Sequence, residues 1–278
     1  MTIHDLINLG IKKLSTISTS PALDSEVLLS HVLDKTKEYL LTNPNKMVDP
    51  KLEKKFLTLL SRRLLGWPVA YMAKSKEFYK HKFYVDKRVL IPRPETEGLI
   101  ELVLKYVKNK PQRILDIGTG SGNIIISLAK ALGKRFNYFA SDISPKAIAV
   151  AKKNAKLHQV KIKFADGNLL EPWGKQKFDV IVANLPYLAK LVDQSTKFEP
   201  IGALVAAKRG LKLYEELFKQ ISFRQLSPSA IFLEIGRDQG LAIKKLAQKI
   251  LPAYEAKVYK DLSGRNRYCQ LIKKTRSV

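Results

Sequence analysis

Four consecutive residues, Asn184-Leu185-Pro186-Tyr187, carry groups that could hold a flat amide or amine for chemistry. They follow the apolar run at 178–183, which predicts a buried strand. The Asn184 side chain offers an acceptor oxygen and two amide protons. Pro186 restricts the backbone of Leu185, and Tyr187 supplies a planar face. Asn184 and the Leu185 carbonyl could accept hydrogen bonds from an NH2 group, which is a weak nucleophile, and hold it in line with an electrophile. Catalysis would then rest on positioning and desolvation of the NH2 group. An ordinary strand-to-loop turn is the alternative.

A glycine-rich loop at 115–123, LDIGTGSGN, lies between a predicted strand and a predicted helix. Gly118, Gly120 and Gly122 allow a tight turn and a close approach of backbone to a ligand. The following helix N-terminus favours a carboxylate or phosphate. A dinucleotide site would require G-x-G-x-x-G, whereas Asn123 follows the third glycine here. The shorter spacing resembles the first motif of class I S-adenosylmethionine (SAM) methyltransferases. A tight turn without a ligand is the alternative.

Two carboxylates lie at the ends of the next two predicted strands. Asp142 follows Gly118 by 24 residues and could accept both hydroxyls of a ribose. It could also cap the helix that begins near Pro145. Asp166, which precedes Gly167, could reach an adenine amino group, although an Asp-Gly turn explains the same pair.

The larger part of the chain, 93–278, alternates strands and helices, which predicts an α/β fold with a doubly wound, mostly parallel sheet. In such a sheet the carboxyl ends of the strands form the ligand crevice, so the residues above are expected to meet there. Strands are predicted at 113–118, 138–142, 161–165, 178–183, 230–235, 256–260 and 267–272, and helices at 96–108, 122–132, 145–158, 211–221 and 239–250.

The first part of the chain has a different pattern. Residues 1–67 predict a small helical domain, in which Ser20-Pro21 and Asp49-Pro50 mark helix starts. Residues 68–92 alternate and are rich in aromatic and β-branched side chains, which predicts a β-hairpin linker.

Composition narrows the class of protein further. The 278 residues are 45% hydrophobic and 27% charged, enough apolar side chain for a globular core. The single cysteine, Cys269, cannot form an internal disulfide, and the histidines show no metal-ligand spacing. No signal peptide or membrane span is predicted, so we expect a cytoplasmic protein that binds neither a membrane nor a metal ion. The net charge of +25 predicts either a solvated lysine-rich surface or transient contact with the ribosome or RNA.

Taken together, the motifs resemble the HemK/PrmC family, the peptide chain release factor glutamine methyltransferases. The resemblance implies a small helical N-terminal domain that helps bind the release factor, followed in the chain by a Rossmann-like class I SAM-dependent methyltransferase domain. It implies methyl transfer from SAM, leaving S-adenosylhomocysteine, to the glutamine amide of a Gly-Gly-Gln loop. It implies that Asn184, Pro186 and Tyr187 act in catalysis and that the stretch from Asn184 to Tyr187 binds the substrate. The cofactor site that it implies comprises Gly118, Thr119, Gly120, Ser121, Gly122, Asp142, Asp166, Gly167 and Asn184. The matching stretches are 64–79, 91–97 (IPRPETE), 115–123, 140–144, 178–187, 198–204 (FEPIGAL) and 261–268.

The chain departs from the family pattern at two places. The family motif is Asn-Pro-Pro-Tyr, and Leu185 replaces its second residue while keeping the backbone carbonyl. Asn-Leu-Pro-Tyr also resembles the motif of rRNA adenine dimethylases, so an amino methyltransferase acting on adenine or cytosine of RNA or DNA is an alternative, as is a methyltransferase of a glutamine in ribosomal protein L3. The stretch 205–211, VAAKRGL, lacks the aspartate that the family usually has there.

Overall fold

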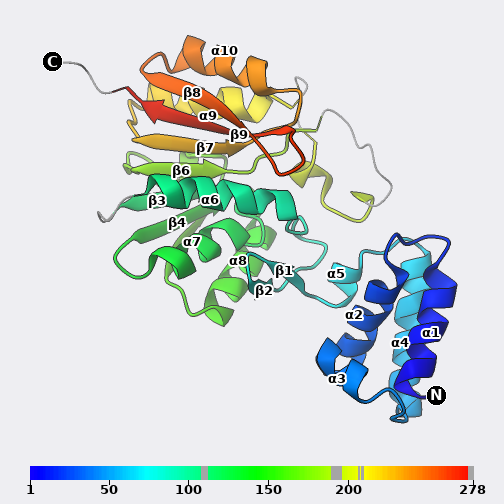
Figure 1. Ribbon diagram of the computed structural model, residues 1–278. Coiled ribbons are helices and arrows are strands. Elements are labelled where there is room, and N and C mark those ends of the chain that lie inside the picture. The colour runs from blue at the N-terminus through cyan, green and yellow to red at the C-terminus, as the bar shows by residue number, and fades with distance from the viewer. Residues whose placement is uncertain (108–111, 189–195, 206, 208–209, 275–278) are drawn as a thin grey trace. The chain divides into compact units, whose positions relative to one another are not determined.

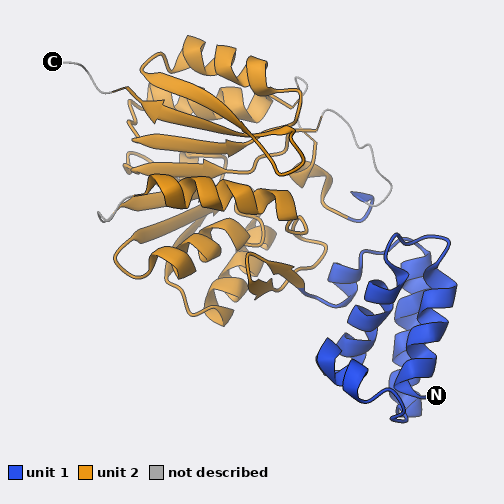
Figure 2. Cartoon of the chain, in the orientation of Figure 1, with its two compact units in different colours: residues 1–75, 193–198 blue, residues 76–192, 199–278 orange. Residues whose placement is uncertain are grey.

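The computed structural model describes residues 1–107, 112–188, 196–205, 207 and 210–274. The chain forms two compact units, shown in different colours in Figure 2. The first comprises Met1–Ser75 with residues 193–198, and the second comprises residues 76–192 and 199–278. Of the predicted hairpin at 68–92, residues 76–92 belong to the second unit and contain both strands, whereas residues 68–75 belong to the first unit and include a helix at Val69–Met72.

The first unit is helical, as the sequence predicts. The Thr2 side chain and Asp5 form a capping box at the start of the first helix, and Asp49 caps the helix that begins at Pro50. These two helices bury Leu6 and Phe56, and the helix at Pro21–Leu33 buries Leu28. The ring of Phe198, from the segment after residue 195, packs 4.6 Å from the ring of Trp67. The helices are α1 (Ile3–Leu14), α2 (Pro21–Leu33), α3 (Lys37–Thr42), α4 (Pro50–Leu64) and α5 (Val69–Met72).

The second unit is built on a seven-stranded sheet with the order β5-β4-β3-β6-β7-β9-β8 (Figure 1). The first five strands in this order are parallel, and β9 is antiparallel to both β7 and β8. This confirms the predicted α/β, doubly wound fold. The strands are β3 (Arg113–Ile117), β4 (Asn137–Asp142), β5 (Ile162–Asp166), β6 (Val180–Ala183), β7 (Ala230–Glu234), β8 (Tyr254–Lys260) and β9 (Asn266–Lys273).

Helices cover both faces of this sheet (Figure 1). One core contains side chains of α6 and α7, such as Leu99 and Ile125, and the other contains Leu217 and Phe218 of α9 and Ile243 of α10. Both cores are therefore sealed by amphipathic helices, which leaves the strand ends as the open edges of the sheet. The helices are α6 (Glu97–Tyr106), α7 (Asn123–Leu132), α8 (Pro145–Leu157), α9 (Lys212–Phe223) and α10 (Gly240–Ile250).

Most predicted boundaries agree with the structure within two or three residues. The strand predicted at 256–260 begins two residues earlier, at Tyr254, because the pairing with β9 extends to Tyr254 opposite Lys273. The Tyr254 hydroxyl also donates a 2.7 Å hydrogen bond to the Pro228 carbonyl. None of the helices in the described part of the chain combines the length and the apolar character that crossing a membrane requires.

The hairpin of β1 (Lys76–Phe78) and β2 (His81–Phe83) has an unusual two-residue turn. Tyr79 and Lys80 both adopt left-handed backbone conformations, with φ of 47° and 62°. Glycine or asparagine normally occupies such positions. Hydrogen bonds hold Tyr79 in place, because its N–H donates to Glu97 and its hydroxyl donates to Glu101, at 2.8 and 2.6 Å.

Replacing the exposed Lys80 with glycine should relieve this strain. We expect Lys80→Gly to raise the free energy of unfolding by about 1 kcal/mol, since a left-handed residue with a Cβ costs roughly that much. Lys82→Gly, in the neighbouring strand β2, is the matched control and should lower it by about 0.5–1 kcal/mol. Urea denaturation measures both, and equal destabilisation by the two variants would show that the turn is unstrained.

Candidate active site

Three neighbouring strands bring the predicted site residues to one edge of the sheet. Ile117, at the end of β3, pairs with Ser141 of β4 on one side and with Ala183 of β6 on the other. The residues that follow, Gly118 and Asn184, therefore leave the sheet beside Asp142. This is the carboxyl edge at which ligands bind in doubly wound folds.

The glycine-rich loop is folded tightly against β4. The N–H groups of Gly118 and Thr119 both donate to the Ser141 carbonyl, at 2.8 and 3.0 Å. Gly118 has φ +71°, and a Cβ there would lie 3.1 Å from a methyl group of Leu185. Glycine at this position is therefore required both by the backbone conformation and by the packing of the next loop.

Asp142 is fixed by backbone donors on both of its carboxylate oxygens. Oδ2 accepts from the Gly120 N–H and Oδ1 from the Ser144 N–H, each at 2.9 Å. Burial raises the pKa of Asp142, and these two N–H groups lower it. The idea that Asp142 caps α8 is wrong, since Ser144 occupies that position and accepts from the Ala147 N–H. Asp142 instead ties the glycine-rich loop to the end of β4.

Asp166 lies beside Asp142 in the register of β4 and β5. Its side chain is exposed, and the next N–H, of Gly167, donates to the Asp142 carbonyl at 3.0 Å. Gly167 has φ +152°, and a Cβ there would come within 3.0 Å of Pro172. The two carboxylates thus share one edge, with that of Asp166 open to solvent.

A buried acid beneath the loop, Asp116, was not among the predicted site residues. It is fully buried within β3, and the Thr119 hydroxyl donates to its Oδ2 at 2.6 Å. Burial raises the pKa of Asp116 to about 7, the Thr119 hydrogen bond lowers it, and the charge of Asp142 raises it. An acid inside the otherwise apolar strand RILDI was the signal in the sequence.

A pocket at this edge joins the glycine-rich loop, Asn184 and the segment 90–96. The Asn184 amide nitrogen donates to the Thr96 hydroxyl oxygen at 3.2 Å. This contact uses one of the two Nδ2 protons and leaves Oδ1 available as an acceptor for a ligand. Thr96 and Arg93 were not predicted as site residues. The pocket is lined by Leu90, Pro92, Arg93, Thr96, Gly118, Thr119, Gly120, Ser121, Asn123, Ile124 and Asn184.

The segment 91–93 is anchored by a buried acid, Glu199. Its Oε2 accepts from the Ile91 N–H at 3.0 Å, and its Oε1 pairs with the Arg93 guanidinium. Glu199 is only 5% exposed, so both contacts are shielded from water. The FEPIGAL stretch therefore supports the wall of the pocket.

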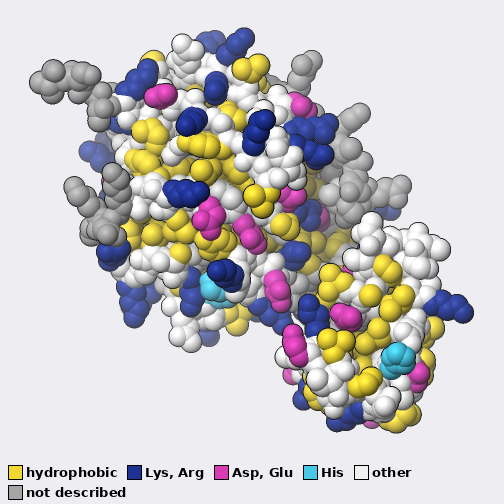
Figure 3. All heavy atoms as spheres, in the orientation of Figure 1, with side chains coloured by type: hydrophobic (Ala, Val, Ile, Leu, Met, Phe, Trp, Pro, Cys, Tyr) yellow, Lys and Arg dark blue, Asp and Glu magenta, His cyan; other side chains and the backbone are white. Residues whose placement is uncertain are grey.

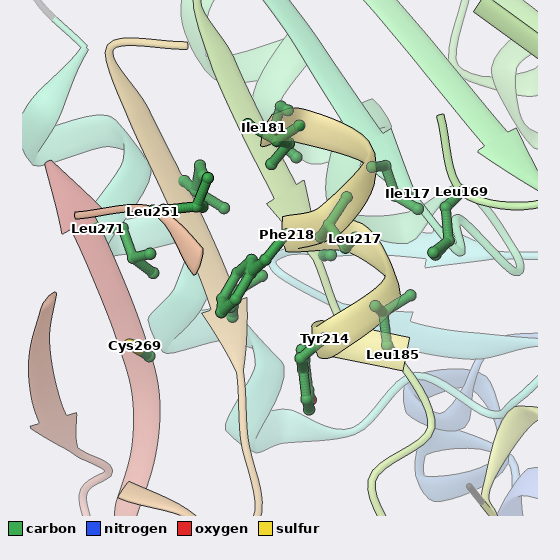
Figure 4. Close-up of a cluster of buried hydrophobic side chains, with 14 of the residues drawn as sticks. Ile117, Leu169, Ile181, Leu185, Tyr214, Leu217, Phe218, Leu251, Cys269 and Leu271 are labelled. Carbon is green, nitrogen blue, oxygen red and sulfur yellow. The ribbon is translucent and has the colours of Figure 1, made fainter. Parts of the chain in front are cut away.

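The Leu185 side chain points away from the pocket and into the core. It is 3% exposed and belongs to the cluster that includes Tyr214 and Leu217 (Figure 4). Its methyl group covers Gly118. The substitution that departs from the family pattern therefore fills space beneath the motif, and what Leu185 can offer a ligand is its backbone carbonyl.

Tyr187 is held at both its hydroxyl and its backbone. The hydroxyl donates to Glu234 Oε1 and accepts from Arg267 Nη1, both at 3.2 Å. The Tyr187 carbonyl accepts from Gln239 Nε2 at 3.2 Å. Burial raises the pKa of Tyr187 above its usual range, so the hydroxyl stays protonated. Glu234, Gln239 and Arg267 were not predicted, and only Glu234, an acid in the apolar strand AIFLE, left a signal in the sequence.

A mixed seven-stranded sheet with a glycine-rich loop and carboxylates at adjacent strand ends defines a Rossmann-like methyltransferase. Residues 108–235 match a family model described as "Methyltransferase domain", and residues 5–73 match the "PrmC N-terminal domain". The chain belongs to the release factor glutamine methyltransferase family.

Curated relatives of that name cover most of both chains. The relative from Enterococcus faecalis is 37% identical and aligns with 84% of this chain and 85% of its own length. The relative from Aliivibrio fischeri is 36% identical over 86% and 87%. Among solved structures, a ribosomal protein L11 methylase from Lactobacillus delbrueckii subsp. bulgaricus has a TM-score of 0.52 at 22% identity, covering 69% of this chain and 84% of that one. This structural likeness shows the shared fold.

Close packing on the Tyr187 carbonyl predicts that Gly210 cannot be replaced. Gly210 and Gly264 both have positive φ, of 79° and 76°. A Cβ at Gly210 would overlap the Tyr187 carbonyl oxygen, whereas one at Gly264 meets open space. We expect Gly264→Ala to cost about 1 kcal/mol of stability and Gly210→Ala about 1–3 kcal/mol more. Urea unfolding of both variants checks this, and equal losses would contradict the close approach.

Proposed function

We propose that this protein transfers the methyl group of SAM to the side-chain amide nitrogen of the glutamine in the Gly-Gly-Gln loop of class 1 translation release factors. The observation that carries the proposal is the orientation of Asn184. Its amide nitrogen donates one proton to Thr96, and the residue lines the pocket, so its oxygen would act there as an acceptor. A carboxamide NH2 is the donor that such an acceptor suits. The family relatives named above support the same substrate.

The cofactor proposal rests on the loop and the strand ends. Gly118 to Gly122 would hold SAM with Asp142, Asp166, Gly167 and Asn184. The fit is supported by Gly120, where open space surrounds the Cα, and by the carboxylate of Asp142 at the end of β4. When bound, SAM supplies the electrophilic methyl group and leaves as S-adenosylhomocysteine.

The substrate proposal rests on the rigid motif after β6. Asn184 Oδ1 and the Leu185 carbonyl would accept the two amide protons of the substrate glutamine, and Pro186 and Tyr187 would complete the pocket. An amide nitrogen is a weak nucleophile, so the contribution of these residues is to orient it. Hydrogen bonds on both sides of the motif, at Thr96 and Glu234, reduce the reorganisation needed to do so.

The remaining parts of the chain have proposed roles in recognition. We assign residues 1–67 to release factor binding and residues 93–278 to methyl transfer in the cytoplasm. Of the predicted linker at 68–92, residues 76–92 join the methyltransferase unit, where Leu90 and Pro92 line the pocket. Lysine and arginine side chains are scattered over the face of the molecule shown in Figure 3. With a net charge of +25, this surface supports transient contact with the ribosome or RNA during encounter with the substrate.

The alternative substrate is an adenine or cytosine amino group of a nucleic acid, and the charge is the observation that favours it. Leu185 does not, because its side chain lies in the core. Incubating the protein with methyl-labelled SAM and either a release factor or total rRNA separates the two. We expect label in the peptide that contains Gly-Gly-Gln, and label in rRNA alone would overturn the proposal.

Asn184→Ala should abolish turnover while leaving the fold intact. The substitution removes the oriented acceptor, so we expect kcat on release factor to fall by about 100-fold or more. Asn137→Ala, an exposed asparagine at the opposite end of the sheet, is the control and should have normal activity. Steady-state kinetics and circular dichroism give the two readouts. Near wild-type kcat for Asn184→Ala would exclude this mechanism.

Asp142→Ala should weaken SAM binding by about 1–3 kcal/mol, the range for hydrogen bonds to a charged group. The control is Glu255→Ala, which removes an exposed carboxylate from β8. Calorimetric titration with SAM measures the affinity of both variants. Equal affinity of Asp142→Ala and the wild type would remove Asp142 from the cofactor site.

A further inference from the structure

Glu234 is a buried acid that neither the cofactor nor the substrate proposal uses. It is the last residue of β7, the strand next to β6, and only 1% of it is exposed. A buried carboxylate costs free energy unless donors surround it. The contacts of its two carboxylate oxygens therefore indicate the role of an acid at this position.

One oxygen of Glu234 anchors the far end of the substrate motif. Oε1 accepts from the Tyr187 hydroxyl, which in turn accepts from Arg267 Nη1. The Arg267 Nε pairs with Asp261 Oδ2 at 3.1 Å. The Tyr187 hydroxyl thus donates one hydrogen bond and accepts another, and together the two bonds fix the orientation of the tyrosine ring.

The other oxygen lies beside the near end of the motif. Oε2 is buried and has no hydrogen-bond partner among the described residues. Tyr268, the partner of Glu234 in β9, donates its hydroxyl proton to the Glu95 carbonyl, which brings the residue before Thr96 to this strand end. Burial raises the pKa of Glu234 to about 7, and Thr96 lowers it. Thr96 Oγ1 already accepts from Asn184 Nδ2, so its single proton is available to Glu234.

We propose that Glu234 is a positioning residue that sets the direction of a hydrogen-bond relay, from Asn184 through Thr96 to Glu234. The carboxylate accepts from Thr96, Thr96 accepts from the Asn184 nitrogen, and Asn184 Oδ1 is thereby presented to the substrate amide. The same carboxylate holds Tyr187, so one buried group fixes both ends of the motif. The inference rests on the proposed function, because the relay needs a substrate that donates a proton to Asn184.

The relay requires the ionised carboxylate, because that form only accepts hydrogen bonds, whereas a protonated carboxyl also donates. Glutamine has the same shape, but the Tyr187 hydroxyl proton needs an oxygen as its acceptor, so the glutamine NH2 group is placed beside Thr96. If that NH2 donates to Thr96, the Thr96 proton turns toward Asn184 and the Asn184 amide is stabilised in the reversed orientation. The substrate then meets an NH2 group where it needs an oxygen.

Four variants test the relay. Glu234→Gln and Thr96→Val should each lower kcat on release factor by about 10-fold to 100-fold, with the affinity for SAM and the KM for release factor within about 3-fold of wild type. Thr96→Ser keeps the hydroxyl and should retain kcat within about 2-fold. The double variant Glu234→Gln/Thr96→Val should be no slower than the slower single variant, because both break the same relay.

The control is Tyr254→Phe, which removes a buried hydrogen bond at the opposite end of the sheet. It should lower the midpoint of urea unfolding without changing kcat. Wild-type kcat in Glu234→Gln, additive losses in the double variant, or a matching loss of SAM affinity would each overturn the relay while leaving the proposed function standing. A wild-type protein that methylates rRNA but no release factor would overturn the proposed function, and the relay with it.

Discussion

The structure depends on how the chain leaves β6. β6, a buried parallel strand between β3 and β7, ends at Ala183, and the partly buried Asn184 and Tyr187 follow it. Unpaired groups at such a place would cost about 1–3 kcal/mol each. The fold meets this constraint by supplying partners from both sides, with Thr96 beside Asn184 and Glu234 beside Tyr187. The motif is therefore rigid before any ligand binds.

The two strands that flank β6 use buried acids in parallel ways. Asp116 in β3 holds the glycine-rich loop through Thr119, and Glu234 in β7 holds the stretch from Asn184 to Tyr187 through the Tyr187 hydroxyl. Burial raises the pKa of each to about 7. Neither acid lines the pocket. Burying each carboxyl group lowers the stability of the fold, and in return each group holds residues at the strand ends in a fixed orientation.

The departure at Leu185 illustrates how a motif can change without altering the groups that face a ligand. Its side chain replaces a proline ring but lies in the core, against Gly118 and beside Tyr214. The backbone carbonyl, the feature that the family motif supplies at this position, is independent of the side chain. The side chain at position 185 can therefore change the packing of the core without changing the hydrogen-bonding groups that face the pocket.

The sequence alone determined the alternation of strands and helices, the glycine-rich loop, and the placement of Asp142 and Asn184 at one edge of the sheet, on either side of β3. These follow from local periodicity and from parallel topology, which places the carboxyl ends of neighbouring strands together. Only the tertiary structure decided that Thr96, Glu234 and Arg267 hold the motif, because their partners lie 88, 47 and 80 residues away in the chain. A buried acid in an apolar strand signals that donors are needed, but which donors reach it is fixed by packing.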